Sequence, residues 1–504
     1  MDVLHPLMLS FPPDPLSQSP LSDQEYDAAI REQIEVLKKL DEAKFFEKTT
    51  GGGNLLDVID PALNTVPYTY ILMANIRNYH KHHGKDIDID SLWGKLTNFL
   101  SVFDPRQIRY LGEALCSIIM NVAEMARGNN KARTPSIPGL AVPPIRNALL
   151  RLDPSGSMLT SNHLILVKLA LESGSYMDVT PVIDKFILYF PGFSDVPRPK
   201  YLCDMSLSPA AFLTPTFKLS DNLRYQSILE YFLWSAMVHM GLHSWESALQ
   251  CLESVITYPA MDSASKIMTE AYKKWVLVGL VHQGRLLRLP KSTSVGPARA
   301  YHIIGKHYET LANIFENGTA SRLKAEVDAA MHIWKKDANY GLVMEVLEAF
   351  QRFQIRGLTQ VYSKISIPEI LNQTTDAVTG SKLPTPQACE DLVRAMIHAG
   401  DLQATLSNPP SGPSILTFLP SSPALTEAQM QRELVGTSAR IQALTEKIKQ
   451  TDRMLTHDKD YIKFIHKQKR AKAARGGNDD HDVAQTSDWD DINDDEDIMG
   501  DGGY

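Results

Sequence analysis

Cysteine is scarce in this 504-residue sequence, and its scarcity narrows the chemistry open to the chain. The four cysteines are Cys116, Cys203, Cys251 and Cys389, and none of them takes part in a CxxC or CxxxH pairing. Disulfide frameworks and structural zinc sites are built from such pairings. The sequence therefore argues against both and favours a reducing compartment.

The sequence also lacks segments that enter or cross a membrane. It contains no run of about 18 apolar residues, so no membrane-spanning helix is predicted. The first 20 residues hold five prolines and no Lys or Arg, unlike a secretory or organellar targeting peptide.

Signatures of nucleotide-binding sites and of common hydrolases are missing as well. The patterns GxxxxGK[ST], HExxH and GxSxG do not occur. An HxH pair stands at His80 and His82, but Trp93 occupies the position where a zinc metalloprotease of the HxH type needs its aspartate. We therefore predict that the chain is not an enzyme and has no catalytic, cofactor-binding or metal-binding residues.

Negative charge is concentrated at one end of the chain. Residues 476–504 hold eleven Asp or Glu and no Lys or Arg. Removing these eleven charges from the net charge of −8 leaves +3, so the rest of the chain has no strong field for nucleic acid. We predict that the Pro- and Ser-rich residues 1–22 and the acidic residues 476–504 are disordered.

Apolar residues at helical spacing predict an α-helical array over residues 23–335. Ser22 and Glu25 resemble a capping box at its start. The clearest helix pair is Leu223–Met240 with Ser244–Tyr258, whose spacing is close to a tetratricopeptide repeat. Because the period is loose, about 40 to 60 residues, we predict a degenerate TPR/HEAT-like solenoid with long surfaces for protein partners.

Residues 336–421 have the element order of a winged helix. The patterns predict helices and then a β-hairpin, at Gly341–Phe353, Leu358–Ile365, Pro386–Ala399, Leu402–Leu406 and Ile415–Phe418. A further helix start is predicted at Ser366, a plausible N-cap followed by Pro368. The fold class predicted for the whole chain is mainly α.

Residues 424–475 are predicted to form one long C-terminal helix. Its partial apolar stripe includes Leu434, Ile441, Leu444 and Ile448. A single helix cannot bury such a stripe, so it needs partner helices. The basic run Lys467–Arg475 suits a helix C-terminus, although a nuclear localisation or nucleic-acid patch remains open.

Three short segments of the array carry a resemblance to a known family. They are TYPAM at Thr257–Met261, AYKKWVLVGL at Ala271–Leu280 and LPKSTS at Leu289–Ser294. They resemble the PCI domain of the third-subunit family of the COP-nine signalosome, and Met396–Leu406 resembles the end of a PCI winged helix. The resemblance covers residues 160–420.

The resemblance implies a non-catalytic scaffold subunit. The signalosome removes the ubiquitin-like modifier Nedd-eight from cullins in cullin-RING ubiquitin ligases, and its zinc isopeptidase is a different subunit. The family implies other signalosome subunits as partners, with the first and eighth as neighbours, and a location in nucleus and cytoplasm. It also implies winged helices paired edge to edge and C-terminal helices gathered in one bundle.

The candidate site residues are therefore interface residues. We expect Ile415–Phe418 to form an edge strand that a neighbouring subunit completes through Ile415, Leu416, Thr417 and Phe418. In the helical bundle we expect contacts from Leu434, Ile441, Leu444 and Ile448. We also hypothesise that Trp489, among acidic residues, anchors a short linear motif in a partner's pocket.

Two alternative functions stay open on the sequence. One is a PCI subunit of the proteasome lid or of translation initiation factor three, against which the match at Thr257–Ser294 speaks. The other is a nucleic-acid adaptor that uses the winged helix. The helix Pro386–Ala399 carries Glu390 and Asp391 against Arg394 alone, a face that would repel phosphate.

Overall fold

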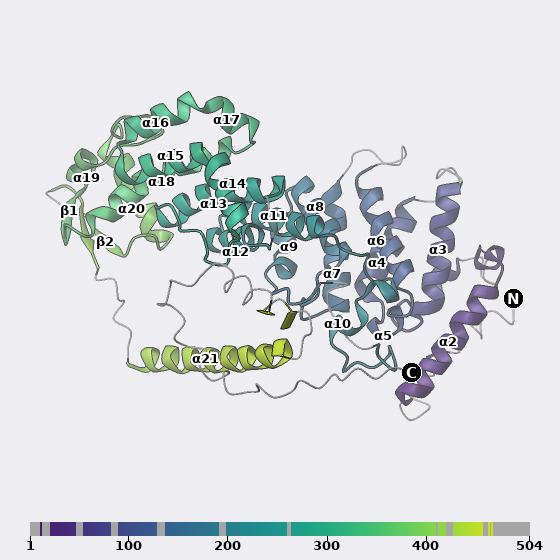
Figure 1. Ribbon diagram of the computed structural model, residues 1–504. Coiled ribbons are helices and arrows are strands. Elements are labelled where there is room, and N and C mark those ends of the chain that lie inside the picture. Colours follow the sequence, from purple (N-terminus) through teal and green to yellow (C-terminus); the bar gives the residue numbers. More distant parts are fainter. Residues whose placement is uncertain are drawn as a thin grey trace, which may run out of the picture. The chain divides into compact units, whose positions relative to one another are not determined.

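The computed structural model describes residues 11–12, 21–46, 54–81, 89–128, 137–190, 198–259, 264–409, 412–419, 427–456, 462–463 and 465–466. The chain forms two compact units, Met1–Phe418 and Leu419–Tyr504. The first contains the helical array and a small three-stranded sheet, and the second contains one long helix (Figure 1). The predicted fold class, mainly α with helical repeats and a winged helix, is confirmed.

The first unit begins with helix α2 (Asp23–Lys39), and the predicted capping box is confirmed at its N-terminus. The Ser22 hydroxyl accepts the Glu25 N–H, and the Glu25 carboxylate accepts the Ser22 N–H. Disorder was predicted for residues 1–22, but this is wrong at Phe11. Its ring lies edge-on to Tyr26, with 4.8 Å between centroids, and its carbonyl accepts a hydrogen bond from Asn64.

Further α-helices and short 3₁₀ helices then follow one another along the chain. They are η1 (Glu42–Phe46), η2 (Leu55–Asp57), α3 (Thr65–Lys81), α4 (Ile89–Val102), α5 (Pro105–Ile108), α6 (Gly112–Ala126), η3 (Pro138–Ala141), α7 (Val142–Leu152), α8 (Ser161–Ser173) and α9 (Tyr176–Ile183). Helices α3, α4 and α6 pack side by side (Figure 1). Gly112 opens α6 against the backbone of a later segment, where an added Cβ would lie 2.3 Å from the Phe217 oxygen.

The array continues through its middle with ten further helical elements among the described residues. These are α10 (Pro209–Phe212), η4 (Pro215–Phe217), α11 (Tyr225–Gly241), α12 (Trp245–Ile256), α13 (Lys266–Gln283), α14 (Val295–Ile304), α15 (Lys306–Asn317), α16 (Ala320–Ala329), α17 (Met331–Lys336) and α18 (Tyr340–Leu358). The predicted pair Leu223–Met240 and Ser244–Tyr258 corresponds to α11 and α12, which pack on each other. The small, fully buried Ala248 lies in this pair.

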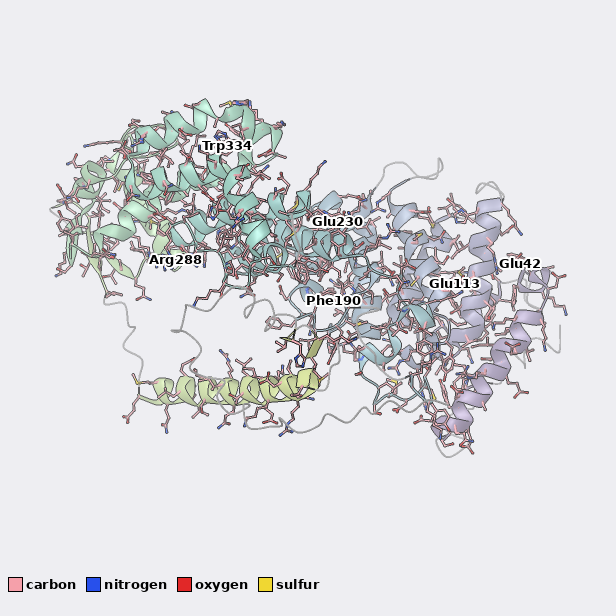
Figure 2. The ribbon with its side chains drawn as sticks, viewed as in Figure 1. Glu42, Glu113, Phe190, Glu230, Arg288 and Trp334 are labelled. Atoms are coloured by element: carbon pink, nitrogen blue, oxygen red, sulfur yellow. The ribbon has the colours of Figure 1, made fainter. Side chains whose placement is uncertain are left out.

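Aromatic side chains fill the core of this middle part. Trp275 and Trp334 are fully buried. The Trp334 ring, labelled in Figure 2, meets Tyr308 edge to face at 4.9 Å, and its indole N–H donates to the Val327 carbonyl at 3.1 Å. A buried Trp with its N–H satisfied stabilises the helix stack without any ligand.

A polar network ties the Ala271–Leu280 motif to the start of α18. Lys273 donates to Glu270 at 2.7 Å and forms an ion pair with Asp337 at 2.8 Å, and Tyr308 donates to Asp337 at 2.8 Å. Burial acts to raise the pKa of Asp337, but the hydrogen bonds from Lys273 and Tyr308 outweigh it and lower that pKa. The network therefore holds α13, α15 and the turn before α18 together.

The winged helix completes the first unit. Its elements are β1 (Lys364–Ser366), α19 (Ile367–Gln373), α20 (Pro386–His398), β2 (Ala404–Ser407) and β3 (Ile415–Phe418). The helix predicted at Leu358–Ile365 is wrong, because α18 ends at Leu358 and Lys364–Ser366 pairs with β3 as a strand. The predicted N-cap Ser366 does precede α19, although its side chain makes no capping hydrogen bond.

Helix α21 (Glu427–Thr456) is the longest described stretch of the second unit. It lies within the helix predicted for residues 424–475, and the end of that prediction, Lys467–Arg475, falls outside the described residues. Among the residues that the structure describes, no helix combines the length and apolar character needed to span a membrane.

Candidate interaction surfaces

The strand expected to bind a neighbouring subunit lies in the middle of its sheet. The order is β1-β3-β2, and Leu416 of β3 pairs with Ile365 on one side and with Leu406 on the other. The expectation that Ile415–Phe418 forms an open edge is therefore wrong. In the described part of the sheet, the strand sides without a partner belong to β1 and β2.

Leu416 is also unsuited to contact another protein. Its side chain is 0% exposed and packs in the winged-helix core with Ile365, Val393 and Cys389, whereas Ile415, Thr417 and Phe418 are half-buried. Burial raises the pKa of the Cys389 thiol to about 11. This thiol is therefore a neutral, unreactive core group.

Strand β2 exposes two of its four residues, and β1 exposes one of three. Thr405 and Ser407 are exposed, and the Ser407 hydroxyl donates to the Ile415 carbonyl at 3.2 Å. An unpaired strand side presents N–H and C=O groups that another strand can bind. The sequence pattern missed β1 entirely, because three residues are too few to show alternation.

Helix α20 carries little free positive charge. Arg394 donates to Glu390 at 2.7 Å, and Ser414 donates to the same carboxylate at 2.9 Å. Within α20, Arg394 is the single Lys or Arg, and this ion pair neutralises it. A winged helix that binds DNA needs free cations on this helix to meet phosphates.

Helix α21 exposes the apolar stripe that the sequence predicted. Leu434, Ile441, Leu444 and Ile448 are 65%, 58%, 59% and 60% exposed. Leu434, Ile441 and Ile448 recur every seven residues, so they share one face. Exposed apolar side chains in a heptad pattern are typical of a helix that packs against other helices. Trp489 lies outside the described residues.

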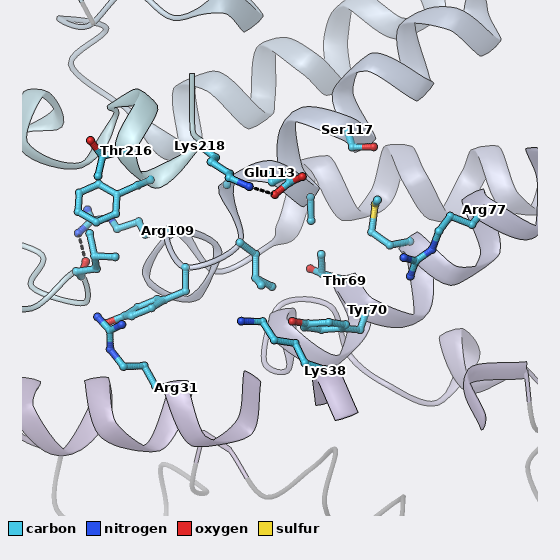
Figure 3. A pocket seen from close by; sticks show the side chains of 17 residues that line it. Arg31, Lys38, Thr69, Tyr70, Arg77, Arg109, Glu113, Ser117, Thr216 and Lys218 are labelled. Carbon is cyan, nitrogen blue, oxygen red and sulfur yellow. Dashed lines mark hydrogen bonds and ion pairs between the residues drawn. The ribbon is translucent and has the colours of Figure 1, made fainter. Parts of the chain in front are cut away.

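A cavity of about 600 Å³ lies between α2, α3, the start of α6 and residues 216–218 (Figure 3). Its cations Arg31, Arg77, Lys38 and Lys218 each pair with a carboxylate, and Figure 3 shows the Lys218–Glu113 pair. The buried Arg109 donates to the carbonyls of Leu202 and Asp204, at 3.1 and 2.6 Å. Because these cations are already engaged, the cavity is not a ready anion site. We interpret it as space left where α2 packs against the rest of the array.

Of the HxH pair, His80 is the member that the structure describes. His80 lies 2.6 Å from the Asn121 side-chain oxygen, and His82 falls outside the described residues. Within the described ranges, no group of three or more His, Cys, Asp or Glu is arranged to hold a metal ion.

Comparison with known proteins identifies relatives of the whole chain. A family model described as COP9 signalosome complex subunit 3, N-terminal helical repeats, matches residues 27–202 and 211–295. The COP9 signalosome complex subunit 3 of Emericella nidulans is 34% identical over 508 residues, covering 98% of each chain. That of Neurospora crassa is 33% identical over 473 residues, covering 92% of this chain and 91% of its own. That of Drosophila melanogaster is 24% identical and covers 70% of this chain and 73% of its own.

Proposed function

Since the chain belongs to the family of COP9 signalosome complex subunit 3, we propose that it joins the assembly through its winged-helix sheet and helix α21. It is a non-catalytic scaffold subunit of the signalosome, the complex that removes Nedd-eight from cullins in cullin-RING ligases. Its partners are other subunits of that complex. It supports the reaction by holding other subunits in place, and the zinc isopeptidase is a different subunit.

The finer proposal names neighbours and location. The winged helix pairs with those of the first and eighth subunits, and the complex acts in nucleus and cytoplasm. The unpaired sides of β1 and β2 support strand pairing on both edges of the sheet. The fully paired β3 does not take part directly, so Ile415, Thr417 and Phe418 contribute through their half-buried side chains alone.

The same proposal assigns a separate role to each part of the chain. Residues 23–335 act as the helical-repeat array, 336–421 as the winged-helix part of the PCI domain, and 424–475 as the bundle helix. The acidic residues 476–504, with Trp489, act as a partner-binding tail. Deleting residues 478–504 tests the tail, because unchanged partner affinity at low salt would contradict it.

The observation that carries the proposal is the exposed stripe on α21. Four large apolar side chains on one 30-residue helix remain more than half exposed. Burying such side chains stabilises an assembly by about 1.5–3 kcal/mol each. The stripe therefore supports a bundle of helices from several subunits.

The test replaces two stripe residues and compares them with a matched pair on the opposite face. Ile441→Asp with Ile448→Asp puts two charges into the proposed bundle. Ala439→Asp with Gln450→Asp places the same side chain on the same helix, about 160–180° around it. Both control positions are exposed.

Tagged chains are expressed in their own cells, and co-purified signalosome subunits and their cullin-deneddylating activity are measured. We expect the stripe variant to lose at least about tenfold in recovered subunits and activity, because two charges would be buried in the bundle. The control variant should assemble normally. Normal assembly of both variants would refute the role of α21.

A further inference from the structure

One long stretch of the array contains no acidic residue. Between Glu270 and Glu309 the chain carries seven Lys or Arg and three His, without a single Asp or Glu. This contrasts with a whole-chain net charge of −8. The stretch runs through α13, the connecting segment 284–294, α14 and the start of α15.

Two of the seven cations are tied into the core network, and five are not. Lys273 and Lys274 lie near Glu270, at 2.7 and 3.8 Å. The remaining five are exposed and have no carboxylate partner among the described residues. They are Arg285, Arg288, Lys291, Arg299 and Lys306. Arg288 is labelled in Figure 2.

Helix α14 adds exposed apolar side chains to these cations. At about 100° per residue, Val295, Arg299, His302 and Ile303 fall within about 100° of the helix circumference. Val295 is 67% exposed and Ile303 is 76% exposed, whereas the opposite side of the helix buries Pro297 and Tyr301 in the core. The outer face of α14 therefore presents a cation between two apolar side chains, and the segments that flank the helix in sequence carry the other exposed cations, Arg285, Arg288 and Lys291 before it and Lys306 after it. We call this set the α14 face.

Two carboxylates that contact this stretch of the chain, Glu309 and Glu316, form no ion pair with its arginines among the described residues. Glu309 accepts hydrogen bonds from Tyr272 at 2.6 Å and meets His302 at 2.8 Å. Glu316 accepts the backbone N–H of Leu286. Both carboxylates are thus committed to other groups, and Arg288 and Arg299 keep their charge available.

We propose that the α14 face docks an acidic segment of a partner protein that carries apolar side chains. The five free cations select a segment rich in Asp or Glu by charge complementarity. Val295 and Ile303 give that segment apolar positions to bury, which a nucleic acid would not use. Charge brings the segment to the face, and burial of the two aliphatic side chains retains it.

The experiment places a photo-crosslinker in the face within the full chain. Benzoylphenylalanine replaces Val295 or Ile303, both exposed enough to leave the core undisturbed, and Lys336 on α17 serves as the control position. The chain is expressed in its own cells, irradiated and purified, and crosslinked peptides are sequenced by mass spectrometry. We expect Val295 and Ile303 to give the same partner peptide, with Asp and Glu exceeding Lys and Arg and with apolar residues at the crosslink.

A charge reversal then tests the cations. Arg288→Glu with Arg299→Glu should reduce the crosslink yield from position 303 about tenfold, since two favourable charge pairs become repulsive. The control is Arg322→Glu with Lys336→Glu, two exposed cations elsewhere on the array, and should leave the yield unchanged. Four results would overturn the proposal: no crosslink at either position, crosslinks to basic peptides or nucleic acid, crosslinks into residues 476–504 of the same chain, or an equal loss in the control.

Discussion

His163 makes the stability of the array depend on pH. It is 4% exposed in α8, and its ring nitrogen Nδ1 accepts the Thr160 N–H at 3.2 Å. Burial, which outweighs the opposing effect of Asp153, lowers its pKa to about 4, from 6.5. Between these two values the unfolded chain binds a proton that the folded chain does not, so stability is full above about pH 6.5 and falls as pH drops towards 4.

The variant His163→Gln keeps a hydrogen-bond acceptor for Thr160 but cannot be protonated. We expect the drop in unfolding free energy from pH 7 to pH 5 to be smaller in this variant by about 2 kcal/mol. Urea denaturation at the two pH values measures it, with the exposed His332→Gln as control. A pH dependence equal to that of the unchanged chain would show that His163 does not carry the effect.

At the scale of elements, local sequence patterns predicted most helices. They missed strand β1, which forms only because a segment far along the chain pairs with it. The pair α11 and α12 shows in the sequence because its contacts lie within one helical repeat. Residues 358–365 have apolar positions at helical spacing, yet Lys364–Ser366 becomes a strand because Ile415–Thr417 is there to pair with it. Nothing near residue 364 indicates that partner.

The candidate interface shows the same limit. The strand Ile415–Phe418 was predicted, but its central position depends on β1, about 50 residues earlier, which the pattern did not show. The stripe on α21 could be predicted from the sequence because it lies on one continuous helix. The cations of the α14 face come from three successive segments, and their free state depends on where Glu309 and Glu316 point.

The central position of β3 predicts a large local effect of Leu416→Ala. The substitution leaves a cavity in the small winged-helix core, and we expect it to cost about 2–4 kcal/mol of local stability. Hydrogen exchange should show lost protection in β1, β2, α19 and α20, with little change in α11 and α12. Thr417→Ala, on the neighbouring half-buried position, is the control and should change protection little. Equal protection in the Leu416 variant would contradict a packed core at this strand.

At the scale of the whole molecule, the array and the winged helix belong to one compact unit, while α21 belongs to the other. The apolar core of the first unit is built by its own residues, from Phe11 to Leu416. By contrast, the described apolar side chains of α21 are exposed. The first unit should therefore fold without the second, whereas under the proposed function the second needs helices of other subunits to bury its stripe.

A chain ending at Leu419 tests this division. We expect its thermal unfolding and its hydrogen-exchange protection up to β3 to match those of the full chain, because no core residue has been removed. Recovery of the other signalosome subunits with it should fall by about tenfold or more, since the bundle loses a helix. The chain with Ile441→Asp and Ile448→Asp serves as the full-length comparison and should show the same two properties. An unfolded truncated chain would mean that the second unit stabilises the first, and normal assembly would mean that the winged helix and the array suffice.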